Sequence, residues 1–552
     1  MKRFSILFVI SALYFGSAEA CTNFIVTRGA SSDGSVMVTY AADSHQLYGA
    51  LYKYNAPRRA YRAGEMMPVY EWDTGKYLGE IEHVPHTYST VGNMNEKQLI
   101  IAESTFGGLP QLWDSTGVMD YGSLIYTALQ RAATAREAIE VIVDLANRYG
   151  YCSSGESFSI ADKNEAWIME LIGKGCRMEN GRNADKGIVW VARRIPDGYV
   201  SGHANQSRIA QFPLDDPENC MYAEDVISFA RRSGLYEGKD EDFSFCDTYC
   251  PLDFSALRGC EARVWSFFNR IADGMEAYAD YAMGYNPENR MPLWVKPDRK
   301  ITPKQLFDCM RDHYEDTPMD MRRDVGAGGH GLPYRWRPMN FEVDGIKYLN
   351  ERATATQQTG FWFTAQARGW LDDHIGGVLW FGVDDAATSP LTPIYCSTKQ
   401  VPWCLSEENG HMTEYSESSL FWIVNRVANF AYLRYDAIGA EVRRTVDGWE
   451  TDRLAQTDEI DAAAAAMKKE KAIKYLTDYS LRTAQQLLDK WTALDRYLLV
   501  KYIDGNIKRQ KDGGFEDNGY GRNIPAQPLF PGYGEKWKRA VAAGDDGTLK
   551  VR

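Results

Sequence analysis

Apolar and polar residues in the first third of the chain alternate in a way that is typical of antiparallel strands joined by short turns. Apolar stretches at residues 22–27 and 36–40 flank a turn rich in glycine, serine and aspartate, which predicts a β-hairpin. Further hairpins are predicted over 88–102 and 157–171, and two more strands over 188–204. The pattern therefore predicts antiparallel sheet from residue 22 onward.

Between the second and third hairpins, the apolar spacing changes to that of helices. Thr134 and Glu137 form a capping box, and apolar residues at helical spacing follow up to a stop at Gly150. Asp120 is a candidate cap for an earlier helix that ends near Ala132. Hairpins that alternate with helices predict an α+β fold, with antiparallel sheet inside and helices packed on the outside.

The middle of the chain is interrupted by many prolines, aspartates and glycines. We expect residues 206–340 to form loops and covering elements, with short helices near 223–232 and 261–272. Residues 361–363 and 377–383 are apolar runs, which predict buried strands that return to the sheet.

Helix-forming residues dominate from Glu417 onward. Helices are predicted over 418–437, 452–475 and 477–502, and a glycine-rich tail follows from Gly513. The expected organisation has four parts: a signal peptide at 1–20, a core at 21–405 with insertions around 206–340, a helical extension at 406–512 and a loosely ordered tail at 513–552.

The first twenty residues have the pattern of a secretory signal peptide. Lys2 and Arg3 precede a largely apolar run of 12 residues, and an Ala-x-Ala pattern ends at Ala20. The run is shorter than the roughly 20 residues that a membrane-spanning helix needs. We expect cleavage after Ala20, a periplasmic or secreted mature protein, and no membrane span.

The composition is that of a globular protein, with 552 residues of which 44% are hydrophobic and 25% charged. Its 75 acidic against 62 basic residues argue against nucleic-acid binding as the main function. The chain has only eight histidines, no His-Glu-x-x-His helix and no Gly-x-Ser-x-Gly elbow. We therefore expect neither a catalytic metal nor a serine nucleophile, and no cofactor.

Cleavage after Ala20 would place a thiol and a free α-amino group on one residue, Cys21. An α-amino group has a pKa of about 7.7 to 8.0, so it can take the thiol proton and return it to a leaving amine. Nucleophile and general base would then be the same residue. Two other interpretations stay open, a disulfide partner and a lipid-anchored cysteine, although Ala18 and Glu19 fit a lipid-attachment signal poorly.

The nine other cysteines are structural candidates in an oxidising compartment. Cys246, Cys250 and Cys260 have a spacing that would also suit zinc, but no fourth ligand is near, so disulfides are favoured. Because nine is odd, at least one of these thiols should stay unpaired in the monomer.

An N-terminal cysteine nucleophile needs a carboxylate to hold its amino group and donors for the oxyanion. Asp43 follows the second strand of the first hairpin, so it can fold back near Cys21; the alternative is a turn or cap residue. Asn205 comes just after a strand and offers an amide donor, with a turn residue again as the alternative.

Several segments, in order from Cys21 to about Tyr395, resemble the bacterial N-terminal-cysteine dipeptidases of the N-terminal-nucleophile hydrolase superfamily. The segments that carry the resemblance are residues 21–23, 32–35 with Asp43, 92–96, 157–162, 165–167, 203–206, 311–318, 356–360 and 376–381.

The resemblance implies a four-layer αββα core and hydrolysis of dipeptides without a metal. It implies that Cys21 is nucleophile and base, that Asp43 holds its amino group and that Asn205 donates to the oxyanion. Many relatives have an arginine where this chain has Tyr40, so the cation beside the thiol is missing or comes from elsewhere, and Tyr40 is a candidate substrate contact. Arg352 is a candidate replacement for that arginine or a clamp for the substrate carboxylate. A surface salt bridge is the alternative role for Arg352.

Two other functions stay open. An N-acyl amide hydrolase, acting on bile-acid conjugates or penicillins, would use the same terminal chemistry. A lipid-anchored extracellular binding protein would use the many aromatic residues as a ligand platform. The sequence also leaves homo-oligomer formation open.

Overall fold

Two antiparallel sheets form the centre of the protein in the computed structural model, which describes residues 21–551. The predicted signal peptide lies outside the described residues. The seven-stranded sheet has the order β16 (Trp294–Val295), β14 (Val200–His203), β1 (Asn23–Val26), β2 (Val36–Asp43), β19 (Thr359–Ala367), β20 (Gly377–Val383) and β21 (Thr392–Tyr395). The eight-stranded sheet has the order β15 (Cys220–Tyr222), β13 (Ile188–Arg194), β10 (Ala166–Gly173), β9 (Gly155–Ala161), β8 (Ile100–Gly107), β7 (Met94–Asn95), β6 (Thr90–Val91) and β3 (Lys53–Tyr54).

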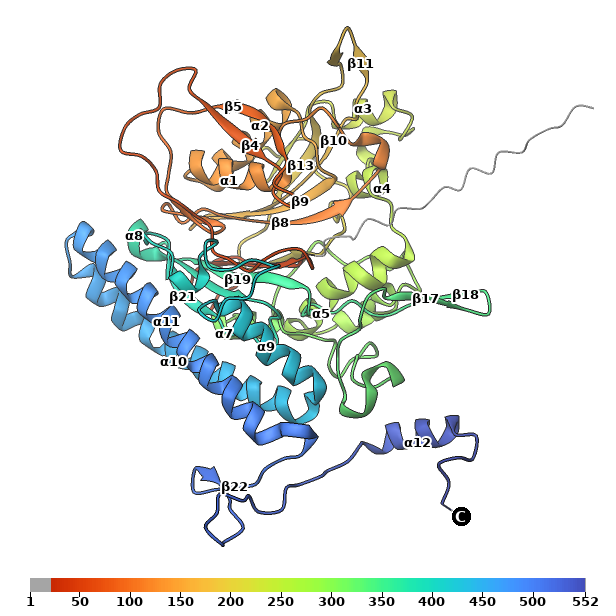
Figure 1. Ribbon diagram of the computed structural model, residues 1–552. Helices are drawn as coiled ribbons and strands as arrows, with labels where there is room; N and C mark the ends of the chain where they lie inside the picture. The colour runs from red at the N-terminus through yellow and green to blue at the C-terminus, as the bar shows by residue number, and fades with distance from the viewer. Residues whose placement is uncertain (1–20, 552) are drawn as a thin grey trace, which may run out of the picture.

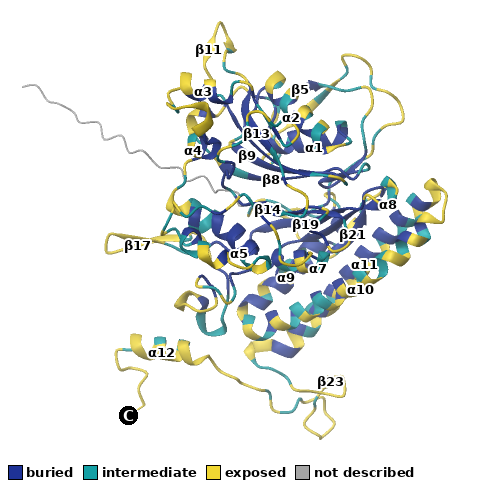
Figure 2. Ribbon diagram, turned by 180° about the vertical axis from the view of Figure 1, so that it is seen from behind, coloured by how far each residue is buried: buried dark blue, intermediate teal, exposed yellow. Residues whose placement is uncertain are grey.

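The two sheets lie face to face, with β2 against β8 and β9 (Figure 1). Val38 of β2, Ile101 of β8 and Phe158 of β9 belong to one buried apolar cluster between them. The strands of this centre are buried almost throughout, as Figure 2 shows. Continuous apolar runs such as residues 377–383 follow from this, because strands covered on both faces need no polar face.

Helices cover the outer sides of both sheets. α1 (Tyr121–Arg131) and α2 (Ala135–Tyr149) pack on the eight-stranded sheet. The other sheet is covered by α5 (Ala262–Ile271), α7 (Pro303–Cys309), α9 (Leu420–Leu433), α10 (Ala440–Ala465) and α11 (Lys469–Tyr502). The protein is thus a mixed helix and sheet structure with a helical C-terminal region (Figure 1).

Shorter elements decorate this core. They are β4 (Met66–Tyr70), β5 (Tyr77–Glu82), β11 (Met178–Glu179), β12 (Arg182–Asn183), α3 (Val226–Arg232), α4 (Phe245–Tyr249), α6 (Ala279–Ala282), β17 (Asn340–Val343), β18 (Ile346–Leu349), α8 (Asp373–Gly376), β22 (Gln510–Lys511), β23 (Gly514–Phe515) and α12 (Glu535–Gly544). Residues beyond Gly513 are largely exposed and include α12 (Figure 2).

The predicted helix caps are present at both early helices. Asp120 accepts a hydrogen bond from the Ser123 amide at 2.9 Å, and Thr134 accepts one from the Glu137 amide at 3.3 Å. The Glu137 carboxylate, however, accepts from the Ala133 amide rather than from Thr134, so the reciprocal half of the capping box is displaced by one residue.

Several element boundaries differ from the sequence prediction, and two of them are explained by local structure. The strand expected over 88–94 is divided into β6 and β7, because Gly92 adopts a positive φ of 49° and turns the chain. The helix expected over 452–475 ends instead at Ala465, and α11 runs from Lys469 without a break at Thr477. The Thr477 hydroxyl donates to the Ile473 carbonyl at 2.8 Å, so this residue is satisfied inside a helix and does not begin one.

The expected disulfides are absent, since all ten cysteines lie within residues 21–551 and all are free thiols. The thiols of Cys246 and Cys250, which would have to lie together in a zinc site, have different neighbours. Cys246 accepts a hydrogen bond from Arg290 at 3.0 Å, and Cys250 accepts one from Gln206 at 3.3 Å. Among the described helices, none combines the length and apolar character that crossing a bilayer requires.

Candidate active site

The first hairpin places Cys21 beside the end of β2. Thr22 and Ala41 exchange two backbone hydrogen bonds, of 3.3 and 3.0 Å, so Cys21 lies opposite the last residues of that strand. Because side chains alternate along a strand, the Cys21 thiol shares a face with the Tyr40 side chain. The backbone amide of Asp43 forms a hydrogen bond with the thiol, and only 4% of Cys21 is exposed.

Glu103 of β8 reaches the thiol from the opposite sheet. The thiol donates to Glu103 Oε1 at 3.1 Å and lies 3.6 Å from the Tyr40 hydroxyl, which donates to the same carboxylate oxygen. Burial, followed by the charges of Glu103 and Asp43, raises the pKa of Cys21 well above its ordinary value. Hydrogen bonds from the Asp43 amide and from Tyr40 oppose this rise. The thiol is therefore protonated in this environment and needs a base.

The Asp43 carboxylate is buried, and each of its two oxygens accepts a hydrogen bond from a neighbouring side chain. Its Oδ2 accepts from Arg352 at 2.5 Å and its Oδ1 from the Thr359 hydroxyl at 2.5 Å. Burial raises the pKa of Asp43, and the charge of Arg352 opposes that rise. Asp43 is thus a buried carboxylate beside Cys21, as expected, and the contact of this carboxylate with the Cys21 amino group stays a prediction.

Arg352 is only 6% exposed, which is inconsistent with a surface salt bridge. Its backbone carbonyl accepts a hydrogen bond from the buried Tyr314 hydroxyl, and the Ala355 amide donates to the Asp312 carbonyl at 3.1 Å. The segment at 311–323 therefore holds the segment that carries Arg352.

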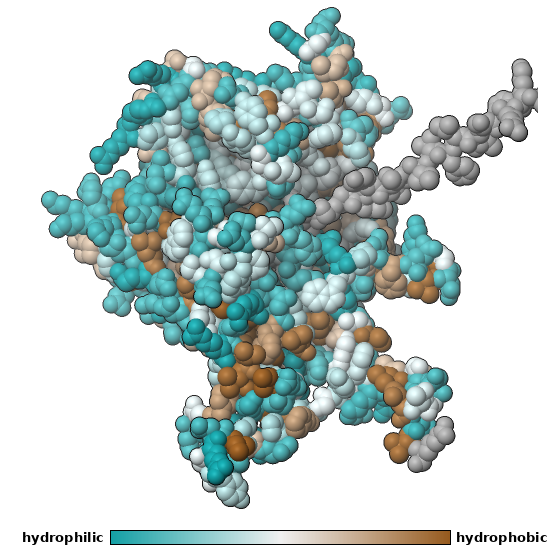
Figure 3. Space-filling model, in the orientation of Figure 1, coloured by the Kyte–Doolittle hydropathy of each residue, from teal (hydrophilic) through white to brown (hydrophobic). Residues whose placement is uncertain are grey.

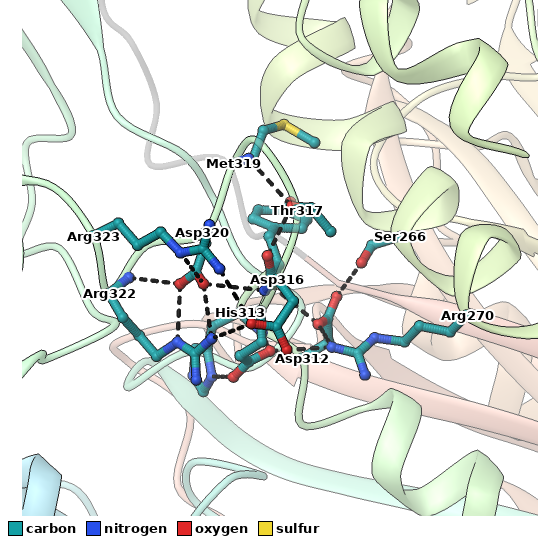
Figure 4. A network of polar contacts seen from close by, with 12 residues as sticks. Ser266, Arg270, Asp312, His313, Asp316, Thr317, Met319, Asp320, Arg322 and Arg323 are labelled. Carbon is teal, nitrogen blue, oxygen red and sulfur yellow. Dashed lines mark hydrogen bonds and ion pairs between the residues drawn. The ribbon is translucent and has the colours of Figure 1, made fainter.

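Ion pairs fix the segment at 311–323 in turn, as Figure 4 shows. Asp312 binds Ser266 and Arg270, and Asp320 pairs with Arg322 at 2.7 Å and with Arg323 at 2.9 Å. The polar side chains of residues 311–318 thus bind one another and nearby arginines and do not contact the thiol. The segment supports the site through the hydrogen bond from Tyr314 to the Arg352 carbonyl.

Asn205 follows β14 in a left-handed conformation, with φ of 56°. Its side-chain amide donates to the Thr105 carbonyl at 2.7 Å and accepts from Arg263 at 2.9 Å. Arg263 of α5 also donates to the Cys21 carbonyl at 2.7 Å and to the Thr22 hydroxyl at 2.8 Å. One guanidinium group therefore joins Asn205 to the strand that begins at the thiol.

The buried thiol, carboxylates and arginines all lie in a part of the chain that matches a known protein family. Residues 20–448 match the model of peptidase family C69. The chain belongs to this family. A relative named probable dipeptidase from Latilactobacillus sakei is 22% identical over 519 residues, which cover 89% of this chain and 98% of the relative. Dipeptidase A from Lactobacillus helveticus is 21% identical over 493 residues, which cover 85% of this chain and 93% of the relative.

Sequence reasoning missed two residues of this candidate site, Glu103 and Arg263. The predicted second hairpin ended at Ala102, one residue before Glu103, whereas β8 continues to Gly107. A buried carboxylate in the middle of an apolar strand was the available signal. Arg263 lies on the buried face of α5. The sequence predicted this helix, but not that the Arg263 side chain points toward Cys21.

A cavity of about 270 Å³ lies beside the Tyr40 side of the site. Phe361 lines this cavity, and its ring centroid is 5.6 Å from that of Tyr40. Phe381, Trp72 and Tyr126 supply further aromatic walls. The candidate site therefore adjoins a space that suits an apolar side chain.

Among the described residues, one group of carboxylates lies close enough together to hold a metal ion, and it is far from Cys21 in sequence. Carboxylate oxygens of Asp308, Asp447 and Glu450 lie within 4.8 Å of one another. Lys304 pairs with all three, at 2.5 to 3.6 Å. Arg311 further pairs with Glu450 at 2.5 Å, so the cluster is explained by ion pairs.

Proposed function

We propose that this C69 peptidase is a secreted cysteine dipeptidase that uses Cys21 as its N-terminal nucleophile after cleavage behind Ala20. The observation that carries the proposal is the buried Cys21 thiol, which lies at the end of β2 among Tyr40, Asp43 and Glu103. We assign the two stacked sheets and their covering helices to the four-layer αββα core of N-terminal-nucleophile hydrolases. Relatives named dipeptidase, aligned over most of their length, support the substrate class.

The proposed reaction needs a base, because the thiol is buried and protonated. The free α-amino group of Cys21 takes the thiol proton, and the thiolate attacks the carbonyl carbon of the peptide bond. The resulting ammonium group returns the proton to the leaving amino acid, which leaves an acyl-enzyme on Cys21. Water then attacks the thioester, and the second amino acid is released with the thiol restored.

The surrounding residues support these steps by position and charge. Asp43, itself held by Arg352, orients the amino group of Cys21. The side-chain amide of Asn205, which lies next to the strand that begins at Cys21 and is bound by Arg263, is assigned to the oxyanion. Once the thiolate forms, the Tyr40 hydroxyl turns its one proton from Glu103 to the sulfur 3.6 Å away, in place of the arginine that many relatives have there.

The proposal is tested by dipeptide hydrolysis in the mature protein and its Cys21→Ser variant. A serine hydroxyl ionises far less readily than a thiol, so we expect the rate to fall by on the order of 10³-fold or more. Cys404→Ser is the matched control, because Cys404 is equally buried, at 4% exposure, and lies in another part of the core.

Equal activity of the Cys21→Ser variant and the mature protein would refute the proposed nucleophile. Membership in a peptidase family favours hydrolysis over the alternative of a lipid-anchored binding protein. The mass of the N-terminal peptide separates the two, since an acylated Cys21 would indicate a membrane anchor.

A further inference from the structure

Glu103 and Glu156 form a buried pair of carboxyl groups directly behind the thiol. They lie on the neighbouring strands β8 and β9, are 1% and 0% exposed, and form a hydrogen bond with each other. Thr105 donates to Glu156 Oε2 at 2.9 Å. Apart from this mutual contact, Glu103 Oε2 and Glu156 Oε1 accept no hydrogen bond from residues 21–551.

The pair carries negative charge that the chain does not balance. Burial raises the pKa of Glu103 and, with the charge of Glu103, raises that of Glu156 well above its ordinary value. When two facing carboxyl groups share one proton, one negative charge remains on the pair. Within residues 21–551, no lysine, arginine or histidine forms an ion pair with either group.

Asp43 gives the contrast on the other side of the thiol. It is equally buried, at 1% exposure, but Arg352 lies 2.5 Å away and neutralises it. A buried charge is costly unless it is paired. The Glu103 and Glu156 pair therefore lacks a cation that the Asp43 side already has.

The position of Glu103 indicates which cation this is. Its Oε1 lies 3.1 Å from the Cys21 sulfur that would attack the substrate carbonyl. In a dipeptide the α-nitrogen is two bonds from that carbonyl carbon, so a substrate in place for attack brings its amino terminus beside Glu103.

We propose that Glu103, supported by Glu156, binds the α-ammonium group of the substrate and restricts the enzyme to peptides with an unblocked amino terminus. This inference rests on the proposed function, because it places the scissile carbonyl at Cys21. The α-ammonium group of Cys21 could bind Glu103 instead of the substrate, and comparing substrates with and without an amino group distinguishes the two. The substrate cation also offsets the carboxylate charge that opposes thiolate formation, which couples substrate binding to activation of the nucleophile.

The test compares the best-cleaved dipeptide with its desamino analogue, in which hydrogen replaces the α-ammonium group. For the mature protein we expect kcat/KM of the analogue to be lower by roughly 10- to 100-fold, as for loss of a hydrogen bond to a charged group. In Glu103→Gln this preference should largely disappear, mainly through a higher KM for the dipeptide. Glu170→Gln is the control, since Glu170 is a fully buried carboxylate of β10 that accepts from Ser207 and the Arg208 amide.

Each outcome has a defined meaning. If the mature protein cleaves no dipeptide, the proposed function fails. If it cleaves the dipeptide and the analogue equally well, the ammonium site is refuted without any variant, so a Glu103→Gln protein that does not fold leaves the inference testable. If Glu103→Gln slows both substrates by the same factor, Glu103 serves the amino group of Cys21 and the inference is wrong.

Discussion

At the scale of single residues, the Cys21 thiol has neighbours that oppose its ionisation and neighbours that favour it. Burial and the charges of Glu103 and Asp43 raise its pKa, whereas the Asp43 amide and Tyr40 lower it. A neutral phenol, not a cation, is therefore the side chain that favours the thiolate here. A hydroxyl is the weaker support for a thiolate, so the base and the substrate must supply the rest.

Tyr40→Phe removes one of the two hydrogen bonds that favour the thiolate. Loss of a donor to the charged form raises a pKa, so the pH profile for alkylation of Cys21 by iodoacetamide should move to higher pH. The measurement is the mass of the N-terminal peptide after timed alkylation, which separates Cys21 from the nine other thiols. Tyr249→Phe is the control, because its hydroxyl donates to the Val226 carbonyl. A profile that is unchanged or moves to lower pH would contradict this role of Tyr40.

At the scale of elements, the register of one hairpin and the twofold alternation of its strands bring the site together. The sequence predicted this hairpin, and with it Asp43 beside Cys21, because turn residues and apolar runs are local signals. Glu103, Arg263 and Arg352 reach the site from β8, α5 and a loop, so their approach depends on sheet stacking that no local pattern encodes.

The two adjacent leucines at 498 and 499 test the packing of α11. Leu498 is fully buried and Leu499 is 48% exposed. Leu498→Ala should lower the free energy of unfolding by about 2 to 5 kcal/mol, since it leaves a cavity in the core. Leu499→Ala should change it by no more than about 0.5 kcal/mol. Urea denaturation measures both, and equal effects would show that this face of α11 does not pack as described.

At the scale of the whole molecule, the C-terminal helices are joined to the sheets by buried polar contacts as well as by apolar packing. Arg311 pairs with Glu450 of α10 at 2.5 Å, and Arg368 pairs with Asp461 of the same helix. Figure 3 shows a mostly hydrophilic surface with apolar patches over the helical region. The helices therefore brace the seven-stranded sheet, in which Cys21 and Asp43 are held.

In the helical region, the sequence predicted the helices but not the position of the break between two of them. Its existence followed from composition, but the turn at residues 466–468 follows a run of alanines with no breaking residue, so the predicted boundary near residue 476 was wrong. The free cysteines were likewise outside the reach of cysteine counting, which cannot tell which thiols face one another.

The most direct test of the account is the activity of two proteins that differ only at the N-terminus. One begins at Cys21, and the other carries a single alanine before Cys21. The added peptide bond removes the α-amino group that would act as the base but leaves the thiol and the core in place. We predict that the protein beginning at Cys21 hydrolyses dipeptides, and that the extended protein has the same unfolding transition but no measurable hydrolysis. Full activity of the extended protein would contradict the N-terminal cysteine mechanism.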